Sequence, residues 1–288
     1  MARRSVEPLI EHRLTLGGHD TRALELEGDG PPYLLFHGFS DSADTWRLVL
    51  DALAHEGRSA IAFDLPGFGT ASGLKKDPVL PQLDDFADAA IEHVGDGAIV
   101  VGNSLGGCVA MRLAERTDGR LGGVVALAPA GLDLSFWIDL LEASPLLTPL
   151  LAMPSPVSGT VVRAVVGLTY QQLALAKPRS VDAKIVSQFT SHFQGRQTVS
   201  EYLALARRLR GELRDPFRLE SISCPLLLVF GDRDRLVPPS GADRVLAVLP
   251  EARLELLEGC GHCPQIEAVD RLLELLEEFA PGELPLAG

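Results

Sequence analysis

The sequence predicts an α/β fold: a mostly parallel, eight-stranded sheet with helices on both faces and a helical cap insertion. Three observations predict it. Short apolar, β-branched runs alternate with helical segments along most of the chain, which is typical of a parallel sheet covered on both sides. One strand-to-helix junction is a tight glycine-bounded turn at 102–106. The stretch 132–214 interrupts the alternation and contains no convincing strand.

The strands are predicted from apolar runs of four or five residues. The first two flank Gly17-Gly18-His19-Asp20 and are expected to form an antiparallel hairpin. The others are buried runs that end at glycine, proline or aspartate. The predicted strands, in chain order, are 13–16, 23–26, 33–36, 60–63, 98–101, 124–127, 226–230 and 254–257.

Helices are predicted between these strands, at 43–54, 86–94, directly after Ser104, 241–249 and 268–279. The interrupting segment offers further helices at 161–175, 184–193 and 199–209. We therefore predict a core in two parts, 1–131 and 215–288, with a helical cap at 132–214. Open α/β sheets bind ligands beyond the carboxyl ends of their strands, where the cap is expected. Its aromatic residues Phe136, Trp137 and Tyr170 are candidates to line a substrate pocket, or alternatively to pack the cap onto the core.

Composition excludes several classes of protein. The 26 Lys and Arg against 39 Asp and Glu give a net charge of −13, which argues against nucleic-acid binding and disfavours anionic membranes. We expect no membrane insertion, because no uninterrupted apolar run reaches transmembrane length. No apolar signal-peptide segment follows the basic residues at the start, so we expect a cytoplasmic protein. The sequence leaves the oligomeric state open.

The four cysteines are too few for a disulfide framework in a chain of 288 residues. Cys260-Gly261-His262-Cys263 spells the active site of a thioredoxin-like disulfide isomerase, but it follows the last strand instead of opening the fold. Two thiols and one histidine also fall short of a structural zinc site. Whether Cys260 and Cys263 form a disulfide stays open. No metal and no cofactor are expected.

The turn Gly102-Asn103-Ser104-Leu105-Gly106 reads G-x-S-x-G, between a strand and a helix. A side chain at either glycine would crowd the neighbouring strand and helix. A serine on such a turn is exposed as a nucleophile. A chance match or a phosphate-binding turn is the alternative, and the flanking strand and helix favour the nucleophile.

A serine nucleophile needs a base, and the base needs a carboxylate that holds its tautomer. His262 follows the last predicted strand in a loop shaped by two glycines and a proline, so we predict it as the base. The acid is expected at the end of the preceding strand, where Asp232 and Asp234 are both candidates. The oxyanion donors are predicted to be the backbone N–H groups of Leu105 and Phe39. We interpret His37 as orienting the loop that carries Phe39.

Five motifs then occur in the order and at the spacings of the α/β-hydrolase superfamily, which the chain resembles over nearly its whole length. They are His37-Gly38-Phe39, Asp64 to Gly69, Gly102 to Gly107, Gly231 to Asp234 and Gly261-His262. The resemblance implies that Asp234 is the catalytic acid, because Asp234-Arg235-Leu236-Val237-Pro238 matches the family pattern. It implies a catalytic triad of Ser104, Asp234 and His262, and no cofactor. A small-molecule ester with an apolar part is then the expected partner.

Within the superfamily several functions stay open. A carboxylic-ester hydrolase is the most economical hypothesis. Gly102 to Gly107 with Pro264-Gln265-Ile266-Glu267 is similar to C–C bond hydrolases of the meta-cleavage type, although Cys263 follows His262 where those enzymes usually carry an aromatic residue. Cofactor-free haloperoxidase or perhydrolase-like enzymes share the triad. His37-Gly38-Phe39 with Trp46 is similar to epoxide hydrolases and dehalogenases, but those need an aspartate at Ser104. A catalytically silent binding protein is the non-enzymatic alternative.

Overall fold

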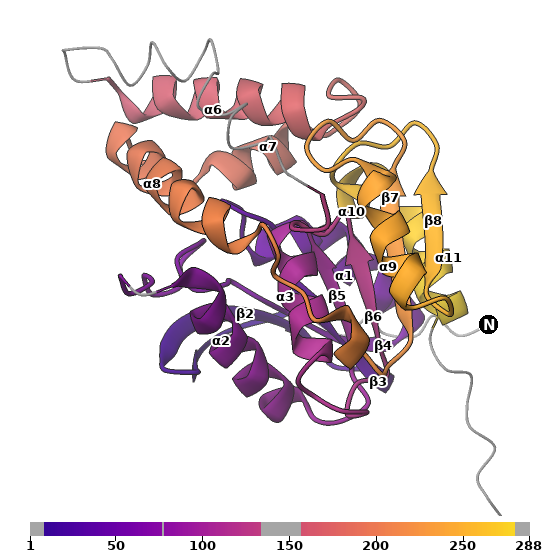
Figure 1. Cartoon of the computed structure of the whole chain (residues 1–288). Helices are drawn as coiled ribbons and strands as arrows, with labels where there is room; N and C mark the ends of the chain where they lie inside the picture. The colour runs from indigo at the N-terminus through magenta and orange to yellow at the C-terminus, as the bar shows by residue number, and fades with distance from the viewer. Residues whose placement is uncertain (1–8, 77, 134–156, 280–288) are drawn as a thin grey trace, which may run out of the picture.

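The structure is a computed structural model that describes residues 9–76, 78–133 and 157–279. One eight-stranded sheet forms its centre, with the strand order β1-β2-β4-β3-β5-β6-β7-β8 (Figure 1). β1, β2 and β4 pair antiparallel, and every other neighbouring pair is parallel. The predicted fold class is thus confirmed. The strands are β1 (Ile10–Leu16), β2 (His19–Leu26), β3 (Asp29–Phe36), β4 (Arg58–Phe63), β5 (Ile99–Asn103), β6 (Gly123–Leu127), β7 (Leu226–Gly231) and β8 (Arg253–Leu257).

Helices cover both faces of this sheet. On one face α1 (Arg47–Glu56) and α11 (Val269–Phe279) bury their leucines against the strands. On the other face α2 (Val79–Val94), α3 (Leu105–Ala114) and α9 (Ala242–Val248) complete a second apolar layer. The apolar layers on both faces contain fully buried strand residues, because a parallel sheet is apolar on both sides. Short elements join these layers: η1 (Ala43–Trp46), η2 (Leu219–Ser221), η3 (Pro239–Gly241) and α10 (Pro264–Glu267).

The parallel register brings the carboxyl ends of the parallel strands to one edge of the sheet. Phe36 at the end of β3 pairs with Gly102 of β5, which pairs with Ala126 of β6. Gly231 at the end of β7 pairs with Leu257 of β8. The loops that follow β3, β5, β7 and β8 therefore gather at this edge. They carry all the residues predicted for catalysis.

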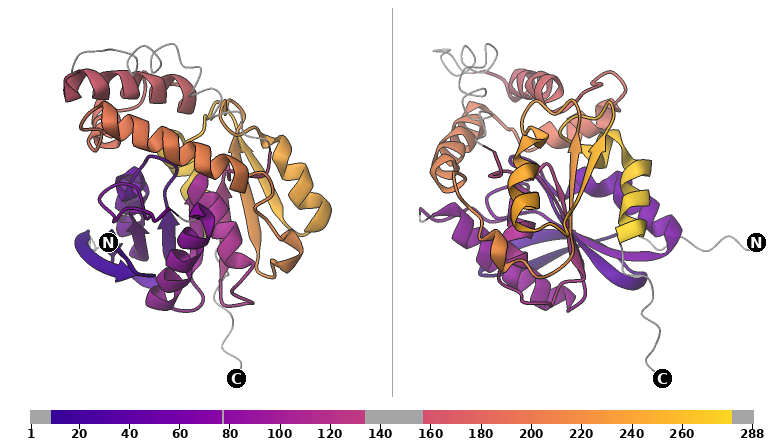
Figure 2. Two further views of the ribbon diagram at one scale, coloured as in Figure 1. Left: turned by 60° about the vertical axis from the view of Figure 1, so that its left-hand side comes forward. Right: turned by 45° about the vertical axis from the view of Figure 1, so that its right-hand side comes forward.

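Three helices lie together beyond this edge, in all three ribbon views (Figures 1 and 2). They are α6 (Gly159–Ala174), α7 (Ala183–Thr190) and α8 (Arg196–Glu212), called the cap helices below. They share an apolar cluster of their own, while the second half of α8 packs into the main core through Leu205 and Leu209. The division at 132 and 214 stays a prediction. Phe136 and Trp137 lie outside the described residues.

Helix α2 begins at Val79, seven residues before its predicted start. No side chain next to it in sequence caps this end. Instead, both carboxylate oxygens of Glu212, at the end of α8, accept hydrogen bonds of 2.8 Å from the backbone N–H groups of Val79 and Leu80. A distant carboxylate satisfies the free donors of the helix N-terminus, and this partner is invisible in the local sequence.

Candidate active site

Ser104 lies at the junction of β5 and α3 with a strained backbone, φ 54° and ψ −112°. Its backbone N–H donates to the carbonyl of Leu127 on β6 at 2.8 Å, which holds the turn against the sheet. A Cβ at Gly102 would lie 2.2 Å from the carbonyl oxygen of Gly106, and one at Gly106 would lie 2.2 Å from that of Phe36. Only glycine fits at either position, so the strained turn depends on both.

His262 and Asp234 form a buried pair beside this turn. Nδ1–H of His262 donates to Oδ2 of Asp234 at 2.7 Å, and the two side chains are 7% and 0% exposed. The other oxygen of Asp234 accepts from the backbone N–H groups of Leu236 and Val237 at 2.8 and 3.0 Å. With Nδ1 protonated, Nε2 of His262 is left as the proton acceptor.

Asp232, the second candidate acid, lies elsewhere. Asp232 is exposed, and its carboxylate accepts a hydrogen bond of 2.7 Å from the backbone N–H of Gly259. It therefore fixes the loop after β8. Arg235, the residue after Asp234, donates to the carbonyl of Gln172 at 2.7 Å and ties the loop of Asp234 to cap helix α6.

Asn103 connects the serine turn to the loop of His262. Its amide donates to the carbonyl oxygen of His262 at 2.9 Å and accepts from Nε2 of Gln265 at 3.2 Å. The backbone N–H of His262 donates to the carbonyl of Ala174 at the end of α6 at 2.7 Å. Sequence reasoning missed Asn103, because the position before the serine is free in the G-x-S-x-G pattern.

His37 holds the loop that carries Phe39. Its Nδ1–H donates to the carbonyl of Gly38 at 2.7 Å, and Nε2 accepts from the backbone N–H of Leu65 at 2.8 Å. Burial lowers the pKa of His37, so the ring is neutral and can serve as donor and acceptor at once. This agrees with the loop-orienting interpretation.

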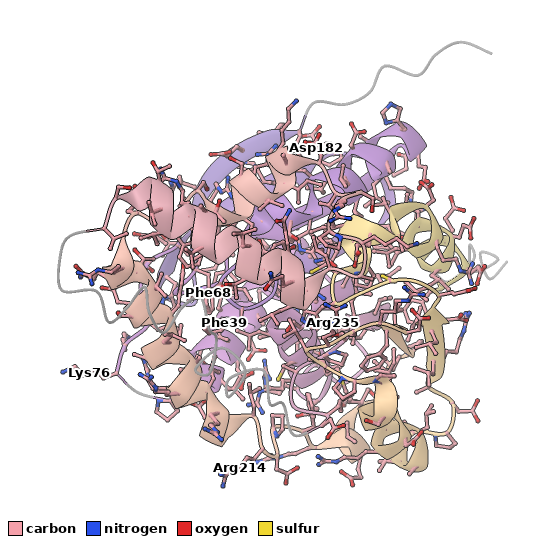
Figure 3. All side chains as sticks on the ribbon, turned by 90° about the horizontal axis from the view of Figure 1, so that it is seen from above. Phe39, Phe68, Lys76, Asp182, Arg214 and Arg235 are labelled. Carbon is pink, nitrogen blue, oxygen red and sulfur yellow. The ribbon has the colours of Figure 1, made fainter. Side chains whose placement is uncertain are left out.

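The two predicted oxyanion donors come from different elements. Phe39 lies in the loop after β3 and packs edge to face on Phe68, with ring centroids 5.3 Å apart (Figure 3). Leu105 is the first residue of α3, where the backbone N–H groups have no partner within the helix. The positive end of the α3 dipole also favours negative charge at this point.

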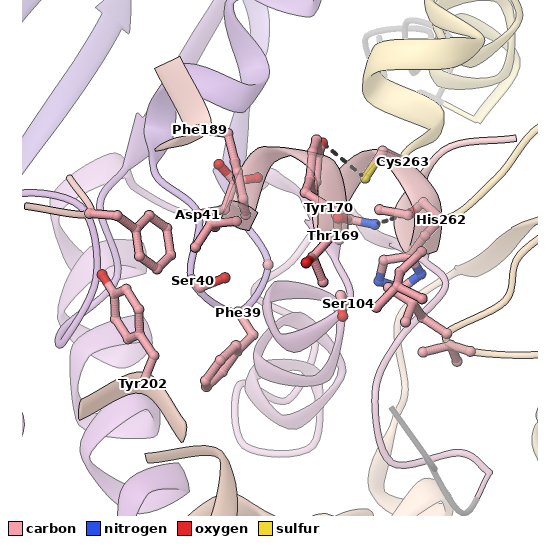
Figure 4. A pocket seen from close by; sticks show the side chains of 18 of the residues that line it. Phe39, Ser40, Asp41, Ser104, Thr169, Tyr170, Phe189, Tyr202, His262 and Cys263 are labelled. Carbon is pink, nitrogen blue, oxygen red and sulfur yellow. Dashed lines mark hydrogen bonds between the residues drawn. The ribbon is translucent and has the colours of Figure 1, made fainter. Parts of the chain in front are cut away.

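A cavity of about 140 Å³ joins these elements (Figure 4). Ser104 and His262 line it, and so does Tyr170, one of the candidate pocket residues. Tyr170 stacks on Phe189 with centroids 4.0 Å apart, and its hydroxyl contacts Sγ of Cys263 at 3.6 Å. Most of the remaining lining is apolar and comes from the cap helices. The cap residues that line it are Val166, Thr169, Tyr170, Leu173, Ala174, Phe189, Phe193, Val199, Tyr202 and Leu203.

His192 connects the cap to the loop of Phe39. Its Nε2–H donates to the carbonyl oxygen of Ser40 at 3.0 Å. Ser40 has a positive φ of 56°, so this hydrogen bond holds a strained residue next to the predicted oxyanion donor. Burial lowers the pKa of His192 to about 4, which keeps the ring neutral at pH 7.

Cys260 and Cys263 are both free and buried. Burial raises the pKa of Cys260 to about 12 and that of Cys263 well above its ordinary value. The thiolate is the reactive form of cysteine, so neither thiol is prepared for disulfide exchange.

Within residues 9–76, 78–133 and 157–279, no three His, Cys, Asp or Glu side chains are grouped so that they could ligate a metal ion. In the same ranges, no helix combines the length and the apolar character that crossing a membrane requires.

Comparison with known proteins identifies relatives with this architecture. Residues 33–275 match the family described as the alpha/beta hydrolase family. The chain is 27% identical over 282 residues to a 2-hydroxy-6-oxo-6-(2'-aminophenyl)hexa-2,4-dienoic acid hydrolase of Metapseudomonas resinovorans, covering 93% of this chain and 89% of the relative. It is 28% identical over 261 residues to a pimeloyl-[acyl-carrier protein] methyl ester esterase of Nitrosomonas europaea, covering 84% and 92%.

The fold itself recurs among solved structures. The 2-hydroxy-6-oxo-6-phenylhexa-2,4-dienoate hydrolase of Rhodococcus sp. strain RHA1 superposes with a TM-score of 0.74 at 23% identity, covering 95% of this chain and 99% of the other. The proteins that resemble this chain therefore include hydrolases named for a dienoic acid or dienoate and an esterase named for a methyl ester.

Proposed function

The chain belongs to the alpha/beta hydrolase family, and from this premise we propose that it is a serine hydrolase that cleaves carboxylic esters. One observation carries the proposal. His262, which is bonded to the buried carboxylate of Asp234, lines the same cavity as Ser104, and Ser104 stands on a strained strand-to-helix turn. This is the arrangement that activates a serine hydroxyl.

The reaction follows from this arrangement. Oγ of Ser104 attacks the ester carbonyl while Nε2 of His262 takes its proton. Asp234 holds the Nδ1–H and stabilises the imidazolium that forms. The backbone N–H groups of Phe39 and Leu105 bind the oxyanion. His262 then protonates the leaving alcohol, and water, activated by the same base, hydrolyses the acyl-enzyme.

The lining of the cavity favours a neutral ester over the charged substrates of the C–C hydrolases. None of the described residues that line it is Lys or Arg. The segment 134–156, outside the described residues, contains no Lys or Arg in its sequence either. The Metapseudomonas relative is named for a dienoic acid, which is a carboxylate at neutral pH. Burying that carboxylate without a cationic partner is costly.

An apolar acyl chain fits the same lining. Aliphatic and aromatic side chains of the cap helices form most of the wall, so burial of a hydrocarbon chain supplies the binding energy, about 0.8 kcal/mol per CH₂. The esterase of Nitrosomonas europaea, whose name specifies a methyl ester, supports this class.

Hydrolysis of C–C bonds is the second candidate, because the Metapseudomonas relative matches over 93% of this chain. One experiment separates the two functions. Rates are measured with 4-nitrophenyl esters from acetate to palmitate and with a 2-hydroxy-6-oxo-dienoate, on the wild type and on Ser104→Ala.

Ester hydrolysis by the wild type alone, with an optimum at a chain of intermediate length, would support the proposal. Cleavage of the dienoate with no ester hydrolysis would establish the C–C hydrolase instead. Equal ester hydrolysis by Ser104→Ala would contradict the mechanism.

A further inference from the structure

The cavity contains a buried carboxyl group that the proposed reaction does not use. Asp41 lies two residues after Phe39, in the loop between β3 and η1, and is 6% exposed. It lines the cavity together with Ser104 and Tyr170 (Figure 4). It also lines a second cavity of about 10 Å³, together with Thr45. Asp41 therefore lies in the wall of the cavity into which Ser104 opens.

The contacts of Asp41 compensate little of the cost of its charge. One carboxylate oxygen accepts from the backbone N–H of Ser42 at 2.8 Å, and the side chain of Thr45 supplies a second hydrogen bond. Among the described residues, no Lys or Arg forms an ion pair with it. The charged groups that act on it, Asp44 and Asp64, are themselves acidic and raise its pKa further. The carboxyl therefore faces the cavity without a neutralising cation.

We propose that Asp41 is a specificity-determining residue, which selects esters with an uncharged acyl part by repelling any substrate that carries a carboxylate into the cavity. The inference deepens the proposed ester hydrolysis and rests on it. Two negative charges in a partly dehydrated cavity repel each other strongly, and the cavity offers no lysine or arginine to offset the repulsion.

The selection should depend on pH. Burial raises the pKa of Asp41 to about 7, with a further increase from Asp44 and Asp64 and an opposing effect of the hydrogen bonds from Ser42 and Thr45. Tyr170 on α6, Tyr202 on α8 and Cys263 in the loop after β8 are uncharged near neutral pH, since burial raises the pKa of each. His192, which bonds the carbonyl of Ser40, is neutral because burial lowers its pKa to about 4, and His262 of the proposed triad lines the same cavity. Asp41 thus gains its charge between pH 6 and pH 8, and exclusion of carboxylates strengthens over that interval.

The test compares two esters of nearly equal shape. In 4-nitrophenyl hydrogen adipate the acyl chain ends in a carboxylate, and in 4-nitrophenyl 6-methylheptanoate it ends in an isopropyl group of similar size. The ratio of kcat/KM for the neutral ester to that for the charged ester is measured at pH 6 and pH 8. Because both rates belong to one enzyme at one pH, titration of the catalytic residues cancels from the ratio.

For the wild type we expect the ratio to rise by up to about tenfold between pH 6 and pH 8, which is the full extent that a single group with a pKa of about 7 can produce. In Asp41→Asn the ratio at pH 8 should fall by up to about tenfold, which corresponds to about 1.4 kcal/mol, and should no longer change with pH. Asp232→Asn, which removes an exposed carboxylate at the same edge of the sheet, is the matched control and should keep the wild-type ratios.

If the ratio for Asp41→Asn at pH 8 lies within twofold of the wild-type ratio at pH 8, the proposal is overturned. The wild-type measurement tests it without any substitution, because a ratio that is constant from pH 6 to pH 8 also overturns it. Failure of the ester hydrolysis itself has a separate signature, namely a folded wild-type enzyme that hydrolyses neither ester. That result would remove the proposed function and the selectivity with it.

Discussion

Asp234 accepts a hydrogen bond of 2.7 Å from Nδ1 of His262, although 28 residues separate them in the chain. Asp232, only two residues before Asp234, is exposed and instead accepts from the backbone N–H of Gly259. The turn after β7 points the two carboxylates in different directions. That of Asp234 orients His262, and that of Asp232 holds the loop after β8. Substitution of each should have very different effects.

We expect Asp234→Asn to reduce kcat by about 10³- to 10⁴-fold, because an amide cannot hold the Nδ1–H tautomer or stabilise the imidazolium. Asp232→Asn should change kcat by no more than about twofold, as is usual for an exposed carboxylate outside the site. Steady-state kinetics on a 4-nitrophenyl ester measure both. Equal losses in the two variants would contradict the assignment of the acid.

The serine turn makes a prediction about stability. Gly102→Ala places a Cβ 2.2 Å from a backbone oxygen, so the turn must move. We expect a loss of at least about 3 kcal/mol in the free energy of unfolding, and a clear drop in Tm. Gly211→Ala is the control, because a Cβ at this exposed position of α8 meets nothing within 4 Å. Alanine there should be neutral or stabilising by up to about 1 kcal/mol. A Tm for Gly102→Ala equal to that of the control would show that the turn tolerates a side chain.

Burial of neutral His192 should make the free energy of unfolding decrease at acidic pH. Its pKa is about 4 in the folded protein and about 6.5 when unfolded, so the unfolded state binds the proton first. Its contribution to stability is complete above pH 6.5 and is lost as the pH falls towards 4. In His192→Gln, the decrease in unfolding free energy from pH 7 to pH 4.5 should be smaller by about 2 kcal/mol. Urea unfolding at the two pH values measures it, and an unchanged decrease would show that His192 is not buried in its neutral form.

The cysteines give a chemical prediction. Because burial raises the pKa of Cys260 to about 12 and that of Cys263 well above its ordinary value, iodoacetamide at pH 8 should leave ester hydrolysis unchanged in the folded protein. Mass spectrometry should find neither thiol alkylated, while unfolded protein should take up label on all four cysteines. Rapid alkylation with loss of activity would instead support a redox role for Cys260-Gly261-His262-Cys263.

Much of the fold follows from local sequence signals. Each predicted strand is found, because buried parallel strands are short apolar runs that turn residues interrupt. Ser104 and His262 were predictable for a similar reason, since glycines must surround a strained turn and a tightly shaped loop.

Other features depend on contacts between distant segments. The start of α2 is fixed by Glu212, more than 130 residues away. The environment of Asp41 arises only when α6 and α7 bring Tyr170 and Phe189 beside the loop after β3. From the residues alone both Asp232 and Asp234 are candidate acids, and the family resemblance favours Asp234. Two aspartates in one turn differ in the direction that the folded turn gives them, and the local sequence does not specify that direction.

The most direct test of the central claim is covalent labelling of the nucleophile. A fluorophosphonate reacts with a serine that is activated by a neighbouring base, and intact-mass and peptide mass spectrometry identify the labelled residue. We predict one adduct, on the peptide that contains Ser104, in the wild type and none in Ser104→Ala. An adduct on another residue, or a folded wild-type protein that takes up no label, would contradict the assignment of Ser104 as the nucleophile.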